Sequence, residues 1–150
     1  MRLFPIAAVA LLLPAPVLAE TGPGFWSYPS TPNLGAEDLA ALCETGFSLI
    51  YADGHRQSFL RVDTDAGPRL ILDSEVECRT DGDQTACAGW VSDGMTQSDS
   101  TTVTRFDHPD GTLRAITDVM DGSAPVTSYP QLCPDSAVRA AFALGATPAP

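Results

Sequence analysis

The stretch from Arg69 to Ser92 constrains the fold most, because it combines a strand rhythm with two of the four cysteines. Even positions from 70 to 78 are mainly apolar, the odd positions from 73 to 79 are charged, and Ile71 breaks this alternation. A period of two predicts a strand with one buried face and one solvent-exposed face. The Asp81-Gly82 pair that follows favours a tight turn, so the stretch is predicted to form a β-hairpin.

The length of the hairpin loop decides which residues face each other. If the four residues Asp81–Gln84 form the loop, Cys78 lies opposite Cys87, close enough for a disulfide. The same register places Trp90 opposite Glu75, with both side chains on one face of the hairpin. A two-residue loop is expected to break this register, and a shorter or bulged arrangement would turn Trp90 into the core.

Residues 1–19 have the pattern of a secretory signal peptide. Arg2 precedes an apolar run over residues 6–13, and Val17-Leu18-Ala19 is a small-residue cleavage pattern. A membrane-spanning helix needs about 20 apolar residues, and neither this run nor any other stretch reaches that length. We therefore expect a mature chain that starts at Glu20, is exported to the periplasm or outside the cell, and is not inserted in a membrane.

The charge of the mature chain is strongly negative. Removal of Arg2 leaves seven arginines and no lysine against nineteen acidic residues, a formal net charge of −12. This charge argues against nucleic acid as a partner and favours a cationic protein or peptide, although acidity can also serve solubility alone. The remaining 131 residues fit one domain with a modest core.

The pattern along the chain predicts a mainly β fold with a short helix near each end. Residues 20–34 are expected to form an extended arm without regular structure, because proline and glycine alternate with Phe25, Trp26 and Tyr28. Residues 35–145 form the single β-rich domain, and residues 146–150 a disordered tail. Helix signals bracket residues 36–44 and 136–144.

Asp-Gly turns separate the predicted strands of the domain. Their spacing favours an antiparallel meander, either a small barrel, which we prefer slightly, or a strongly curved sheet. The polar segment 92–100 is predicted to be a mobile loop. The predicted strands are residues 47–52, 57–62, 69–78, 85–91, 101–106 and 113–120, with a short one near Val126.

Four cysteines in an exported chain predict two disulfides. The hairpin register pairs Cys78 with Cys87, which leaves Cys43, on the first helix, for Cys133, just before the second. No two cysteines have the spacing of a redox motif, and no closely spaced ligand pairs indicate zinc.

The sequence indicates no other chemistry. We predict no catalytic residues, no metal and no cofactor, and we therefore expect that the protein is not an enzyme. His55 and His108 stand beside Asp-Gly turns, as surface-loop residues do. No serine has the setting of a nucleophile elbow. The pairs at 63–65 and 81–83 begin like calcium loops but lack the later ligands.

Two functions are compatible with this plan, which resembles that of exported lysozyme inhibitors and small lipocalin-like carriers in architecture only. The first is a binding module that recognises a cationic protein or peptide, with Asp73, Glu75 and Glu77 as the attracting face and Trp90 as an anchor. The alternative, ranked second, is a carrier of a small apolar ligand inside the barrel. An open interior would favour the carrier, and a filled interior with a flat acidic face would favour the binding module.

Overall fold

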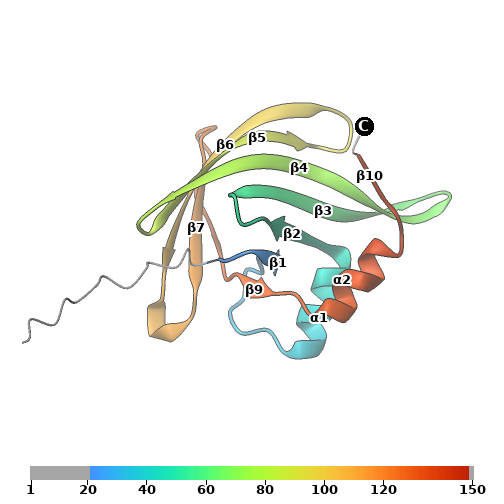
Figure 1. Ribbon diagram of the computed structural model, residues 1–150, viewed down its shortest axis with the longest axis horizontal. Helices are drawn as coiled ribbons and strands as arrows, with labels where there is room; N and C mark the ends of the chain where they lie inside the picture. Colours follow the sequence, from blue (N-terminus) through green and yellow to red (C-terminus); the bar gives the residue numbers. More distant parts are fainter. Residues whose placement is uncertain (1–20, 149–150) are drawn as a thin grey trace, which may run out of the picture.

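The computed structural model describes residues 21–148, so the predicted signal peptide lies outside the described part of the chain. One sheet contains all ten strands found there, with two α-helices and a short 3-10 helix (Figure 1). The elements in chain order are β1 (Gly24–Ser27), α1 (Ala36–Thr45), β2 (Gly46–Ile50), β3 (His55–Thr64), β4 (Gly67–Asp81), β5 (Gln84–Ser92), β6 (Gln97–Asp107), η1 (Pro109–Gly111), β7 (Arg114–Val119), β8 (Val126–Ser128), β9 (Gln131–Leu132), α2 (Asp135–Phe142) and β10 (Ala146–Pro148).

The sheet is curled, and its two edge strands do not pair with each other. The strand order is β8-β7-β6-β5-β4-β3-β2-β1-β9, and β10 pairs with β4 beside this path. The edge strands β8 and β9 are neighbours in the chain, separated only by Tyr129 and Pro130. The Tyr129 N–H donates to the Pro29 carbonyl at 2.8 Å, which ties this connection to the segment after β1. The mainly β, antiparallel meander with two helices is therefore confirmed, in the form of a half-barrel.

A β-bulge in β4 exchanges the two faces of the sheet. Ser58 pairs with Ser74 while Phe59 pairs with Leu72, so Asp73 is an extra residue in β4. An extra residue reverses the alternation of side chains beyond it. Leu70 and Leu72 therefore share a face with Glu75 and Glu77, whereas Ile71 lies on the opposite face with Ser74 and Val76. The expectation that one face of this strand is buried along its whole length is wrong.

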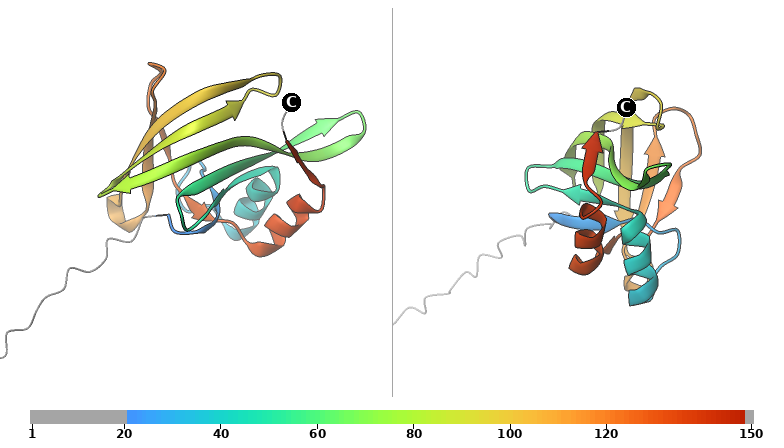
Figure 2. Two further views of the ribbon diagram at one scale, coloured as in Figure 1. Left: turned by 45° about the horizontal axis from the view of Figure 1, so that its top comes forward. Right: turned by 90° about the vertical axis from the view of Figure 1, so that its right-hand side faces the viewer.

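The hydrophobic core lies between one end of the outer face of the sheet and the two helices (Figure 2). Phe47 and Phe59 pair across β2 and β3, and the ring of Phe142 from α2 lies 5.4 and 5.3 Å from theirs. Cys43 of α1, fully buried, is bonded to Cys133. The helix faces that cover the sheet carry small side chains, Ala137 and Ala141 among them, which let α2 approach closely.

Three boundary expectations are corrected by strand pairing. The predicted arm contains β1, which pairs with β2 and β9. The predicted disordered tail contains β10, which runs parallel to β4 from Ala146 to Pro148, and residues 149–150 lie outside the described part. The predicted loop 92–100 is shorter than expected and consists of a turn at 93–96, where Asp93 accepts backbone hydrogen bonds from Met95 and Thr96.

The hairpin of β4 and β5 has the predicted register with a shorter loop. Asp81 pairs with Gln84, so Gly82 and Asp83 alone form the turn. Gly82 has a φ of 61°, a conformation that glycine adopts without steric cost. Cys78 pairs with Cys87 and the two form a disulfide with a Cα–Cα distance of 4.1 Å. The expectation that a two-residue loop breaks this register is wrong, because the two turn residues are Gly82 and Asp83, one residue later than Asp81-Gly82.

Candidate functional site

The outer face of the sheet carries the acidic residues singled out in the sequence. Trp90 pairs with Glu75 on one side and with Asp99 on the other, so these three side chains form a row across β4, β5 and β6. Glu77 stands two residues further along β4 on the same face and is exposed. Trp90 is half-buried and lies on the carboxylate face, as the predicted register requires.

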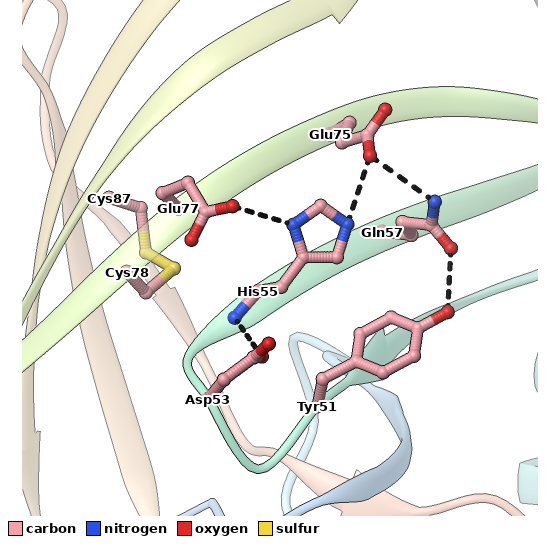
Figure 3. A network of polar contacts seen from close by, with 8 residues as sticks. All are labelled: Tyr51, Asp53, His55, Gln57, Glu75, Glu77, Cys78 and Cys87. Carbon is pink, nitrogen blue, oxygen red and sulfur yellow. Dashed lines mark hydrogen bonds and ion pairs between the residues drawn. A yellow bond between two sulfur atoms is a disulfide. The ribbon is translucent and has the colours of Figure 1, made fainter.

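His55 lies between the two glutamates and was missed as a site residue. Its Nε2 is 2.9 Å from Glu75 Oε1 and its Nδ1 is 3.0 Å from Glu77 Oε1 (Figure 3). Both ring nitrogens of His55 therefore contact a carboxylate, so a residue of the chain itself already lies against the two glutamates of the acidic face.

Neighbouring polar groups surround the histidine (Figure 3). The Tyr51 hydroxyl donates to Gln57 Oε1 at 2.9 Å, and Gln57 Nε2 makes a longer bond of 3.4 Å to Glu75 Oε1. The His55 backbone N–H donates to Asp53 Oδ1 at 3.0 Å. His55 is thus the first residue of β3 and not a loop residue as expected, whereas His108 does lie in a loop, directly before η1.

Asp73 does not join this face as the sequence suggested. As the extra residue of the bulge it lines a shallow depression together with Trp26, Ser58 and Leu60. Partial burial raises the pKa of its carboxyl above the ordinary value. The structure therefore brings Glu75, Glu77 and Trp90 together and leaves Asp73 apart.

The inner face of the half-barrel is an open cleft. A cavity of about 380 Å³ is lined by side chains from strands β3 to β8 and from the segment after β1. A second cavity of about 280 Å³ lies next to it, and Arg56 and Thr104 line both. The residues that line the larger cavity are Tyr28, Arg56, Ser58, Ser74, Val76, Cys87, Val91, Ser100, Thr102, Thr104, Thr117, Val119, Val126 and Ser128.

Hydroxyl groups dominate the polar lining of this cleft. Ser48 and Ser58 are bonded at 3.0 Å, as are Thr104 and Thr117, each pair joining adjacent strands. Such pairs satisfy the hydroxyls without water and leave methyl groups and Val76 exposed to the cavity. The inner face therefore offers an apolar surface with scattered hydrogen-bonding groups, and it differs from the phenylalanine-rich core under the helices.

Among the described residues, Arg56 is the one charged residue that lines the larger cavity. Its Nη2 donates to Ser48 Oγ at 3.2 Å, and its Cζ lies 4.5 Å from the centre of the Tyr28 ring, a cation–π contact. No carboxylate within residues 21–148 forms an ion pair with it. Burial raises the pKa of Tyr28, against the opposing effect of the Arg56 charge, so the phenol stays neutral.

Two further features fix the wall of the cleft. Cys87 lines the larger cavity and Cys78 the smaller one, so their disulfide clamps β4 to β5 at the cleft surface. A Cβ on Gly89 would lie 2.1 Å from the Glu75 carbonyl oxygen. Only glycine allows this approach of the two strands, which sets both the cleft wall and the Glu75–Trp90 pair on its other side.

The described residues contain no group of three or more histidine, cysteine or acidic side chains arranged to hold a metal. Within the same residues, no helix is both long enough and apolar enough to cross a membrane. Comparisons with protein-family models, with curated proteins and with solved structures find no match to this chain. Its function is therefore argued from the geometry of these two faces.

Proposed function

We propose that the protein is an exported small-molecule-binding protein whose ligand lies in the inner cleft of the half-barrel. The observation that carries this proposal is the open cavity of about 380 Å³ on the inner face, within the range of ligand sites. The two disulfides, Cys43–Cys133 and Cys78–Cys87, fit an oxidising compartment and support export.

The composition of the cleft favours an amphipathic ligand over the wholly apolar one expected from the sequence. Val76, Val91 and Val119 supply apolar contact, and the serine and threonine hydroxyls supply hydrogen bonds. Burying the apolar part of a ligand here stabilises the complex by roughly 25 cal/mol for each Å² removed from water. Because the interior is open, we rank the small-molecule carrier above the protein-binding module, which reverses the order expected from the sequence.

A blocking substitution tests the location of the ligand. Thr102 lines the cavity, whereas its neighbour Thr101 is exposed and stands on the outer face opposite Ala88. The probe is N-phenyl-1-naphthylamine, an uncharged fluorophore that brightens in apolar surroundings. We expect saturable binding to the oxidised wild type and to Thr101→Trp, and a loss of about tenfold or more in affinity in Thr102→Trp, because the indole fills the cavity.

Denaturation midpoints of the two tryptophan variants serve as the control for folding. Equal probe binding by Thr101→Trp and Thr102→Trp would contradict a ligand site in the cleft. Absence of saturable binding to the wild type would contradict it as well.

Recognition of a cationic protein or peptide by the outer face is the second candidate. The row of Glu75, Trp90 and Asp99 favours it, because an aromatic anchor flanked by carboxylates suits a basic partner. It ranks second because His55 already lies against both Glu75 and Glu77.

A further inference from the structure

We infer that the cleft selects ligands that carry an anionic group, a carboxylate or a similar oxyanion, next to an apolar body, and that Arg56 binds this group. The inference rests on the proposed ligand site in the cleft and adds the chemical class of its ligand. It follows from the position of Arg56, which lines both cavities and so stands where they meet.

Among the described residues, the contacts of Arg56 leave most of its donors available for an anion. A guanidinium group has five N–H donors, and the contact to Ser48 Oγ uses one of them. The Tyr28 ring stacks on the group and the β2–β3 pairing fixes the backbone of Arg56 opposite Ile50, so the side chain is held in place. A planar, pre-positioned guanidinium matches the two oxygens of a carboxylate better than a flexible ammonium group does.

The charges of the described residues around Arg56 also favour an anionic ligand. Asp53 is the other charged residue that lines the cavities, and its Oδ1 accepts the backbone N–H of His55. The glutamates of the outer face are engaged by His55 on the opposite side of the sheet. A half-buried cation that has no carboxylate partner within residues 21–148 is costly, and an anionic ligand would relieve that cost.

The apolar body of the ligand has a defined place next to Arg56. Val76, Val91 and Val119 line the same cavity on β4, β5 and β7, while Ser58 and Ser74 stand beside Arg56 on β3 and β4. An anionic head at Arg56 with an apolar chain along the valines would place both parts of the molecule in matching surroundings. An anion without an apolar part, such as free acetate, gains only the first of these contacts.

The test uses three probes with unbranched alkyl chains of similar length and different head groups: octanoate, octanol and octyltrimethylammonium. Titration calorimetry on the oxidised wild type at neutral pH measures each affinity. We expect octanoate to bind roughly ten- to a hundredfold more tightly than octanol, because one desolvated hydrogen bond between charged groups contributes an affinity gain of about that size. The octyltrimethylammonium ion should bind more weakly than octanol, because its charge would face Arg56.

Arginine variants test whether Arg56 causes the preference for octanoate over octanol, and Arg56→Gln and Arg61→Gln change the net charge equally. Arg56→Gln should lower the octanoate affinity to that of octanol, and Arg56→Lys should restore part of the difference. Arg61→Gln, on the same strand but beside Asp63 on the exposed surface, should leave the difference intact.

The possible failures have different meanings. If octanol binds as tightly as octanoate to the wild type, the preference for an anion is wrong while the cleft remains a ligand site. If Arg56→Gln and Arg61→Gln lower octanoate binding equally, Arg56 is not the anchor. If none of the three probes binds, both the ligand class and the proposed function are wrong. The comparison of probes on the wild type stays decisive even if an Arg56 variant does not fold.

Discussion

Trp90 of β5 stands between Glu75 of β4 and Asp99 of β6 on the outer face of the sheet, and each is its direct cross-strand partner. An aromatic side chain held between two carboxylates is a surface that a basic partner could cover. The same strands line the inner cleft on their other side, because the disulfide between Cys78 and Cys87 and the bulge at Asp73 fix their register and faces.

If this face attracts a basic partner, reversing its charge should slow association. The double variant Glu75→Lys/Glu77→Lys should reduce the association rate of a lysine-rich peptide about tenfold at low ionic strength and flatten its salt dependence. Trp90→Ala should mainly speed dissociation. Surface plasmon resonance measures both rates. The control Glu44→Lys/Asp65→Lys changes the net charge equally at two exposed positions. If both double variants slow association equally, the attraction comes from the net charge and not from this face.

The two disulfides should differ in their effect on stability. The Cys43–Cys133 bridge closes a sequence separation of 90 residues and the Cys78–Cys87 bridge one of 9. In the chain-entropy model, the long bridge contributes about 4 to 5 kcal/mol and the short one about 2 to 3 kcal/mol. Urea denaturation of the two double cysteine-to-alanine variants measures this difference. A larger loss from the short bridge would contradict the order.

Asp73 should make the stability of the protein depend on pH. Its pKa is raised by burial, so its contribution to stability is present below the ordinary carboxyl pKa of about 4 and is lost as pH rises through the raised value. Asp73→Asn should therefore be more stable than the wild type at pH 7, with the advantage fading towards pH 3. Denaturation midpoints at both pH values test this.

The exposed Asp65 provides the matched control for that substitution. Asp65→Asn should show little difference from the wild type at either pH. A stability gain of Asp73→Asn that is equal at pH 3 and pH 7 would show that the carboxyl charge is not its cause.

The sequence was sufficient to predict the main strands, the two helices and the register of the central hairpin. Paired cysteines and an Asp-Gly turn restrict the hairpin to few registers, and the position of Trp90 on the carboxylate face follows from the same register. The bulge at Asp73 could not be predicted from the sequence, because the even positions are apolar or small on both sides of it. Leu72 packs under the helices and Val76 lines the cleft, yet both fit one continuous period of two.

The parts missed were those that depend on pairing with distant segments. The strands β1 and β10 are short and rich in proline or glycine, and they exist because β2, β9 and β4 offer open edges. His55 became a site residue only when β3 was paired with β4, which placed it opposite Glu77. Pairing residues 47–52 with 57–62 around Asp53-Gly54 would have brought it close to the strand and was the one available signal.

Intermolecular NOEs show directly whether a bound probe contacts methyl groups on the inner or on the outer face of the sheet. In a methyl-labelled sample with octanoate, we expect NOEs from the alkyl chain to Val76, Val91 and Val119, which line the cleft. We expect none to Leu70 and Leu72, which pack in the core under the helices on the outer face. NOEs to the leucines without any to the three valines would place the ligand outside the cleft and contradict the account.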